Sequence, residues 1–155
     1  MCMLFLTTAG SVMRVSQRRP DTTSETMVKG YLAVDEVENT VMTAPGIDPS
    51  VPPSGAGCVD CDAVKGWWVH LRRCAQCGHI GCCDSSPSQH ASAHAERAGH
   101  PIVRSFEPGE DWFWNYRTEQ FYDGPALAAP EHHPLNQPVP GPAGRVPTDW
   151  QNQVH

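Results

Sequence analysis

No hydrophobic run in this 155-residue sequence is long enough to span a membrane. The apolar stretch at the start is only about five residues long, and no Lys or Arg precedes it, which argues against a secretion signal. Positive charge is also scarce, because 11 Lys and Arg stand against 17 Asp and Glu for a net charge of −6. This balance argues against a surface for nucleic acid or anionic membranes. We therefore expect a cytoplasmic protein that binds neither.

Aromatic residues are scarce towards both ends of the chain, which limits where a core can form. Four of the five tryptophans lie between residues 67 and 114, whereas residues 124–155 hold seven of the 15 prolines. We predict an irregular or disordered leader over 1–57 (with Met42 as a possible true start), a folded domain over 58–123 and a solvated Pro-rich tail over 124–155. A domain of about 66 residues usually needs a metal or disulfide staple.

Cysteine and histidine are concentrated in the predicted domain, where metal is a better explanation than disulfides for a cytoplasmic chain. Two Cys-x2-Cys pairs, each able to place two thiolates on one tetrahedral ion, are Cys58/Cys61 and Cys74/Cys77. They are followed by Cys82, Cys83, His90, His94 and His100. Two closed zinc sites need eight ligands, a number reached if only one of the two adjacent cysteines binds. The sequence therefore predicts two structural zinc ions and leaves the choice between Cys82 and Cys83 open.

The motifs of catalytic zinc are missing. A protease helix would need His-Glu-x-x-His, but Ala91 follows His90. A deaminase would need a later Cys-x-x-Cys, but no cysteine follows Cys83. Eight ligands also close both sites, whereas a catalytic zinc keeps an open position. We expect no enzymatic activity, with a thiol or redox sensor using Cys83, a zinc-dependent hydrolase and a nucleic-acid module as alternatives.

Capping signals predict one clear helix over about residues 87–98. Ser86 suits the N-cap, Gln89 completes a capping box with it, and Gly99 suits the left-handed position after the last turn. This helix would place His90 and His94 one turn apart on the same face.

Strand signals surround the helix. They predict strands in GWWVHLRRC (66–74), CGHIGCC (77–83), PIVRSFE (101–107), DWFWNY (111–116) and EQFY (119–122). Pro108-Gly109 predicts a type II turn. The expected fold class is α+β, a small zinc-stapled antiparallel sheet with one clear helix and irregular ends. We expect the tryptophans to form much of the core, His70 and His79 to pack or orient neighbours, and the pair His132/His133 to be solvated.

The segments GCVDC (57–61) and WVHLRRCAQCGHIGCCDSSPSQHASAHAERAGHPIVRSFEPGEDWFWNY (68–116) resemble the UBP-type zinc finger, the ubiquitin-binding finger of some deubiquitinases and of a histone deacetylase. The likeness covers about 58–122 and is greatest to stand-alone bacterial members. It implies a twisted antiparallel sheet with flanking helices and an interleaved pairing of the zinc ligands. By that pairing, Cys58, Cys61, Cys82 and His90 would hold one ion, and Cys74, Cys77, His94 and His100 the other.

The chain also departs from this family. Relatives with a third zinc use a cysteine where this chain has Asn115, so we do not expect a third site. Trp114 and Tyr116 correspond to aromatic walls around the ubiquitin tail in ubiquitin-binding relatives, whereas Asp84 and Ser85 stand in place of the Arg and Tyr that hold the tail carboxylate. The resemblance thus implies an interaction module with an unknown protein or peptide partner, and we expect no useful affinity for ubiquitin.

Overall fold

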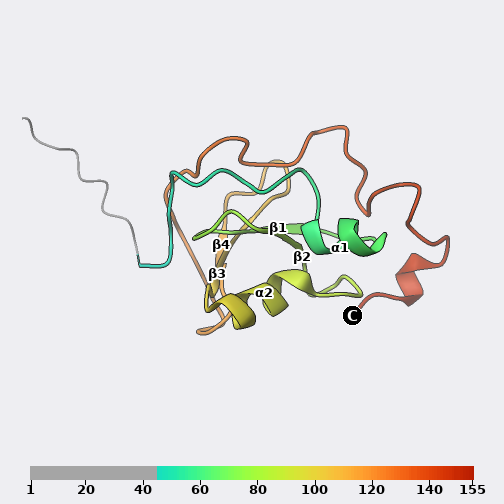
Figure 1. Cartoon of the computed structure of the whole chain (residues 1–155), viewed down its shortest axis with the longest axis horizontal. Helices are drawn as coiled ribbons and strands as arrows, with labels where there is room; N and C mark the ends of the chain where they lie inside the picture. Colours follow the sequence, from blue (N-terminus) through green and yellow to red (C-terminus); the bar gives the residue numbers. More distant parts are fainter. Residues whose placement is uncertain (1–44) are drawn as a thin grey trace, which may run out of the picture. The chain divides into compact units, whose positions relative to one another are not determined.

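The computed structural model describes residues 45–155, which form an antiparallel sheet with helices beside it (Figure 1). The strands are β1 (Leu71–Cys74), β2 (Ile80–Cys82), β3 (Ile102–Ser105), β4 (Phe113–Asn115) and β5 (Gln120–Tyr122), in the order β2-β1-β3-β4-β5. The helices are α1 (Val59–Val64), α2 (His90–Ala98) and the short 3-10 helix η1 (Trp150–Asn152). The predicted α+β class is confirmed, and α1 is an additional short helix. Met42 lies outside the described residues.

Strand register divides the side chains between two faces of the sheet. Arg73 pairs with Arg104, and Arg104 pairs with Phe113, so these three residues share one face. The opposite face carries Arg72 and Gly81, which pair across β1 and β2. A Cβ at Gly81 would lie 2.7 Å from the backbone nitrogen of Ala91, so only glycine lets α2 approach this second face so closely.

The tail covers the first face, with the described part of the leader beside it (Figure 1). Residues 124–155 are irregular apart from η1, as predicted. They are not a solvated tail, however, because Leu127 is 5% exposed and His133 is 4% exposed. A bridge also joins Trp68 to Gly141. The expectation of a solvated tail, and of a solvated His133 within it, was wrong.

Two buried arginines explain why the tail packs here. Arg73 donates to the carbonyl oxygen of Ala128 at 2.8 Å and to that of Val51. Arg104 donates to the carbonyl oxygen of Glu131 at 2.9 Å. A buried guanidinium needs acceptors for its N–H groups. The strands have already used their carbonyls in pairing, so the irregular tail and leader supply the acceptors.

The helix α2 begins at His90 rather than at residue 87, because Ser86 is used elsewhere. The Ser86 hydroxyl is fully buried and accepts the backbone N–H of Val69 at 2.9 Å. Gln89 instead occupies the cap position with φ of 48° and makes no side-chain cap bond, so the predicted capping box is absent. Gly99 does end the helix, with φ of 69° and its N–H donating to the carbonyl of Ala95.

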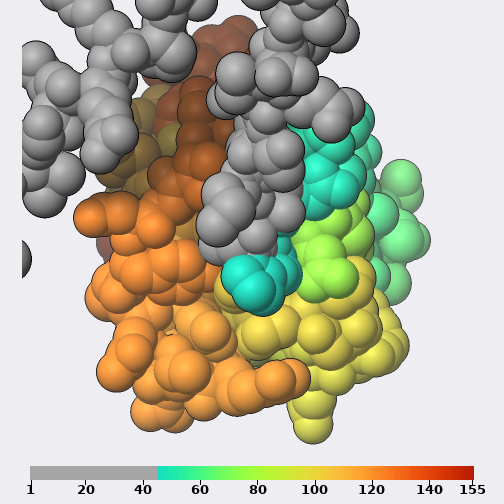
Figure 2. Space-filling model, turned by 90° about the vertical axis from the view of Figure 1, so that its left-hand side faces the viewer, coloured from blue at the N-terminus to red at the C-terminus, as the bar shows by residue number. Residues whose placement is uncertain are grey.

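The strands follow the predicted order, but the first is shorter. β1 begins at Leu71, and Trp68 before it is buried in the core, whereas Trp67 is only partly buried. The Pro108-Gly109 turn is confirmed by a φ of 82° at Gly109 and a hydrogen bond across the turn. In the space-filling view, the orange surface of residues after β4 lies against the yellow surface at the end of α2 (Figure 2), where the Tyr116 N–H donates to the Pro101 carbonyl.

Among the helices of residues 45–155, none combines the length and the apolar character that a membrane crossing requires.

Candidate metal centres

The first metal cluster brings together residues from three elements. Cys58 precedes α1 and Cys61 lies within it, while Cys82 ends β2 and His90 begins α2. The Cys58 sulfur accepts the backbone N–H of Cys61 at 3.4 Å, so the first turn of α1 fixes the spacing of this pair. All four donor atoms lie within 4.8 Å of one another.

The donor distances in this cluster match the edges of a zinc tetrahedron. With Zn–S near 2.3 Å and Zn–N near 2.0–2.1 Å, sulfur and nitrogen ligands should be about 3.6 Å apart and two sulfurs about 3.8 Å apart. The His90 Nδ1 lies 3.4, 3.3 and 3.5 Å from the sulfurs of Cys58, Cys61 and Cys82. The sulfurs of Cys61 and Cys82 are 3.9 Å apart. The donor set and its size therefore fit one zinc ion.

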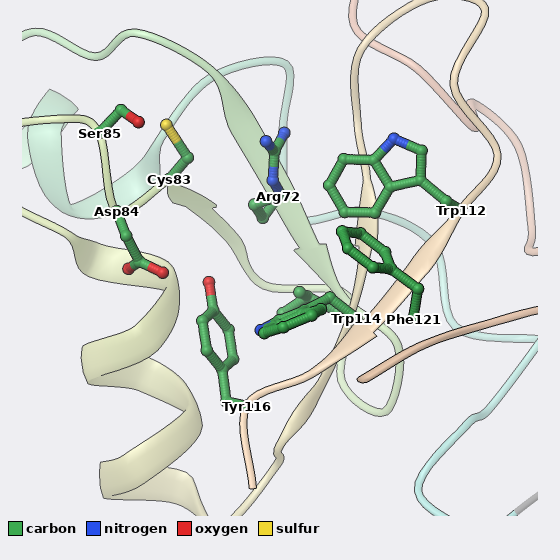
Figure 3. Close-up of a pocket in the computed structure, with 9 residues that line it drawn as sticks. Arg72, Cys83, Asp84, Ser85, Trp112, Trp114, Tyr116 and Phe121 are labelled. Carbon is green, nitrogen blue, oxygen red and sulfur yellow. The ribbon is translucent and has the colours of Figure 1, made fainter. Parts of the chain in front are cut away.

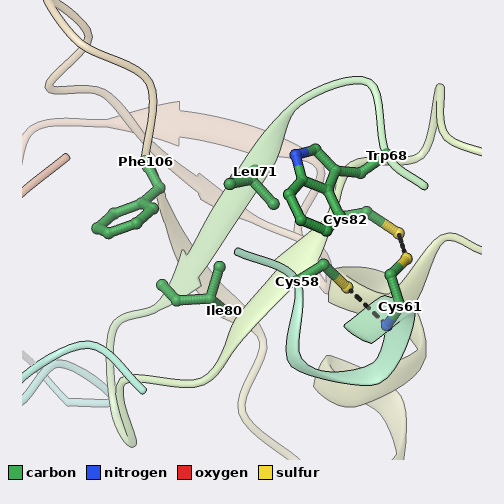
Figure 4. Packing of buried hydrophobic residues seen from close by; sticks show 7 residues of the cluster. All are labelled: Cys58, Cys61, Trp68, Leu71, Ile80, Cys82 and Phe106. Atoms are coloured by element: carbon green, nitrogen blue, oxygen red, sulfur yellow. Dashed lines mark hydrogen bonds between the residues drawn. The ribbon is translucent and has the colours of Figure 1, made fainter. Parts of the chain in front are cut away.

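This cluster is also part of the core. Figure 4 shows the three cysteines packed beside Trp68, Leu71 and Ile80, in a buried group that also includes Phe106. Cys58, Cys61 and Cys82 are each 0% exposed. The metal ligands thus hold α1 and α2 against the β2 edge of the sheet.

The second cluster joins Cys74 at the end of β1 and Cys77 in the following turn to His94 in α2 and His100 after it. The Cys77 sulfur lies 3.3 Å from the Nε2 of His94, and the Cys74 sulfur lies 3.7 Å from the Nδ1 of His100. Both distances again match a tetrahedral edge. The eight predicted ligands therefore meet in two groups of four, with the interleaving that the family resemblance implied.

The two adjacent cysteines have different surroundings. The sulfur of Cys82 belongs to the first cluster, whereas the sulfur of Cys83 lies 3.4 Å from the Ser86 hydroxyl. Neighbouring residues of an extended chain point to opposite faces. The structure therefore brings Cys82, and not Cys83, to the other donors.

Burial shifts the pKa of two ligands of the second cluster before metal binds. Burial raises the pKa of the Cys74 thiol to about 11, because a buried thiolate loses its hydration. Burial, followed by the charge of His79, lowers the pKa of His94 to about 4. His94 is therefore a neutral imidazole at pH 7, ready to bind metal, while the Cys74 thiol needs a nearby cation to ionise. A zinc ion supplies that charge and displaces the proton.

His79 links the two clusters without belonging to either. Its Nε2 lies 2.9 Å from a carboxylate oxygen of Asp60, the residue before Cys61. Its ring stacks on that of His94, with centroids 4.2 Å apart. The prediction that His79 packs and orients its neighbours is confirmed, and the Asp60–His79 pair ties the helix of the first cluster to a ligand of the second.

A cavity of about 240 Å³ opens on the α2 face of the sheet, beside the first cluster (Figure 3). Its walls include the predicted partner-binding residues Trp114 and Tyr116. Trp112 and Trp114 are only partly buried, so they line this cavity rather than filling the core as expected. Asp84 and Ser85 lie on the side of the cavity opposite Trp112 and Phe121 (Figure 3).

The sequence reasoning missed Arg72 as a residue of this cavity. Its guanidinium carbon lies 4.6 Å from the ring centroid of Trp112. Arg72 is two residues before Cys74, so strand alternation placed the two on one face. The missing information was the pairing of β1 with β3, which brings Arg72 opposite Ser105 and next to the aromatic strand β4.

The comparison with protein families agrees with this geometry. The family described as "Zn-finger in ubiquitin-hydrolases and other protein" matches residues 58–127. A protein of Rhodopseudomonas palustris, solved by NMR in solution as a structural-genomics target, is 43% identical, with 59% of this chain and 85% of that chain covered and a TM-score of 0.47. No curated protein matches the chain. Through residues 58–127, with their two clusters each suited to one zinc ion, the chain belongs to the UBP-type zinc-finger family.

Proposed function

We propose that the protein is a non-enzymatic interaction module, in which two zinc ions hold a binding face for a protein or peptide partner. Each metal cluster offers four protein donors, and four ligands complete the tetrahedral shell of zinc. Such a site leaves no position for a substrate or an activated water, which supports a structural role for the metal. The same clusters of reduced cysteines suit a cytoplasmic location.

The observation that carries the proposal is the aromatic cavity on the α2 face. Trp114 lies in β4, Trp112 directly precedes that strand, and Phe121 lies in β5 and is 66% exposed. Partly exposed aromatic side chains around a cavity are the typical anchors of protein recognition. Because Cys83 and Asp84 directly follow the zinc ligand candidate Cys82, metal binding also fixes one wall of this cavity.

The charges of the cavity argue against the ubiquitin tail as its ligand. Asp84 would place a negative charge near an incoming carboxylate, and its own carboxylate points towards Tyr116 (Figure 3). Arg72 already donates to the Leu71 carbonyl at 2.9 Å and covers the ring of Trp112. Losing a charge-assisted contact costs roughly 2–5 kcal/mol, which is about 30-fold to several thousand-fold in affinity. Repulsion by Asp84 adds to this loss, so a micromolar affinity would fall towards millimolar or weaker.

Titration calorimetry with ubiquitin tests this point. We expect no heat of binding at micromolar concentrations, for intact ubiquitin or for ubiquitin lacking its last two glycines. Tight binding that depends on those glycines would instead assign the ubiquitin tail to this cavity.

The interaction itself can be tested in the full-length, zinc-loaded chain. A photo-cross-linking amino acid at the exposed position Phe121 should capture a partner in cells, and Trp114→Ala should abolish the capture. Trp150→Ala is the matched control, because Trp150 lies in η1 and does not line the cavity. Capture that is unchanged by Trp114→Ala, or no capture at all, would refute a binding role for this face.

The hydrolase alternative has a spectroscopic test. Cobalt substituted for zinc should give the intense visible absorption of four-coordinate ions with sulfur ligands. A five-coordinate spectrum, or a bound water that exchanges with added anions, would show an open position and favour catalysis.

A further inference from the structure

Among residues 45–155, only two charged side chains line the cavity beside the first zinc cluster, Arg72 and Asp84. Arg72 is part of the wall, since its Nη1 donates to the Leu71 carbonyl and lies 3.4 Å from the Ser105 hydroxyl. The Ser105 hydroxyl in turn donates to the carboxylate of Glu110. Arg72 is thus held by the sheet, with one face of its guanidinium against Trp112.

Asp84 is the charge that is left for a ligand. Its carboxylate forms no ion pair with any Lys, Arg or His within residues 45–155. Figure 3 shows it at the edge of the cavity, directed towards the Tyr116 hydroxyl. Burial, and after it the negative charge of Asp84, raises the pKa of Tyr116, which agrees with a carboxylate lying close to that ring.

The aromatic rings across the cavity from Asp84 stand at steep angles and form walls (Figure 3). Phe121 meets Trp112 at 83° with centroids 5.3 Å apart, and it meets Trp114 at 60° with centroids 4.7 Å apart. Tyr116 closes the side towards α2. Arg72 lies over the face of Trp112, as expected from the negative potential of an aromatic face, which the neighbouring rings share.

We propose that this cavity binds the ammonium group of a lysine side chain from the partner, with Asp84 as its counter-ion and Trp114, Tyr116 and Phe121 as its aromatic walls. Arg72 already lies over the face of Trp112, so the incoming ammonium would lie against the other rings, on the side of Asp84. This inference rests on the proposed interaction function and names the chemistry that the module recognises.

Three small probes test the inference on the full-length, zinc-loaded chain: N-acetyl-lysine amide, its trimethylated form, and the neutral isostere in which tert-butyl replaces trimethylammonium. Tryptophan fluorescence and calorimetry would follow binding. We expect at least one of the two cations to bind at least about tenfold more tightly than the neutral isostere. The trimethylated probe keeps the positive charge but has no N–H. Its binding therefore separates recognition by the aromatic rings from recognition that needs an N–H donor to Asp84.

Asp84→Asn should weaken binding of the better cation by about tenfold or more. Asp111→Asn is the matched control, because Asp111 is exposed, lies beside Trp112 and does not line this cavity. Zinc content and near-ultraviolet circular dichroism establish that both variants are folded. Equal binding of the neutral isostere, or an unchanged affinity in Asp84→Asn, would overturn the inference.

The two proposals fail in different ways. If cross-linking at Phe121 captures a partner that Asp84→Asn still binds fully, the interaction module stands and the lysine inference falls. If no partner is captured but the cation probes bind in an Asp84-dependent manner, the chemistry of the cavity stands and its role in partner binding falls.

Discussion

At the residue scale, the clearest contrast is between Cys82 and Cys83, which are adjacent in sequence and differ in surroundings. Cys82 lies 3.5 Å from the His90 Nδ1, and Cys83 contacts the Ser86 hydroxyl. We expect Cys82→Ala to lose one of two zinc ions and Cys83→Ala to keep both, measured by native mass spectrometry. The reverse pattern would make Cys83 the ligand and would require the β2 edge to be rearranged.

Glu107 is a second residue whose role is set by its contacts. Its carboxylate accepts the Leu71 N–H at 2.8 Å, lies 2.6 Å from the His133 Nε2 and lies 3.6 Å from the His70 Nδ1. Burial alone would raise the pKa of Glu107, but the contacts with His70, His133 and the Leu71 amide outweigh it and lower the pKa to about 2. The carboxylate is therefore charged and stabilised in the folded state.

Glu107→Gln should reduce the free energy of unfolding at pH 7. A fall in pKa from 4.5 to about 2 corresponds to about 3 kcal/mol, at roughly 1.4 kcal/mol per unit. Because the pKa is depressed in the folded state, this stability is present above about pH 4.5 and is lost as the pH falls towards 2. Denaturant unfolding of both proteins from pH 8 to pH 4 checks the sign: their difference should be constant above pH 5 and shrink below it. A difference that grows on acidification would assign the stability to another group.

At the scale of elements, the tail acts as a structural part of the domain. The buried Arg73 and Arg104 donate to the carbonyl oxygens of Ala128 and Glu131, and Leu127 packs with Ile47 and Phe113. Deleting residues 124–155 would leave both guanidinium groups short of acceptors, at a cost of about 1–3 kcal/mol each or more. We expect this deletion to lower the thermal midpoint strongly.

The control for the tail is a shorter deletion, of residues 149–155, most of which are exposed. Its midpoint should stay close to that of the full chain. If removal of residues 124–155 were equally harmless, the arginines would have found other acceptors, and the tail would be dispensable for the fold.

Local signals in the sequence predicted the elements that are determined locally. Gly99 and Gly109 take positive φ where a helix end and the type II turn after Pro108 require it, so those boundaries were predicted. The prediction of Ser86 as the N-cap was wrong because its hydroxyl accepts the backbone N–H of Val69, 17 residues away. No cap rule based on neighbouring residues can anticipate such a contact.

The candidate site was predictable to a similar extent. Spacing identified the donors, whereas the residues alone left their pairing and the choice between Cys82 and Cys83 open; the pairing needed the family resemblance. The cavity was half predicted, through Trp114 and Tyr116. The contribution of Arg72 was not predicted. It depends on which strand lies next to β1, and strand order is a property of the whole sheet.

At the scale of the whole molecule, the two metal clusters join α1 and α2 to the β1–β2 side of the sheet. Their ligands come from α1, β1, β2 and α2, and the Asp60–His79 pair connects one cluster to the other. The cysteines of the first cluster also form part of the core around Trp68. Metal binding and folding are therefore coupled, because an unfolded chain does not offer four donors at tetrahedral distances.

The purified chain should carry two zinc ions, and complete chelation should unfold the domain. The expected readout is loss of the near-ultraviolet circular dichroism of the tryptophans, since Trp68 is packed against the cysteines of the first cluster. Acidification should release zinc as well, because protons compete for the thiolate ligands. Re-addition of zinc to the chelated chain should restore the signal, which separates metal loss from irreversible aggregation. A content of one or three ions, or a full tryptophan signal in metal-free protein, would show that the two clusters do not hold the fold together.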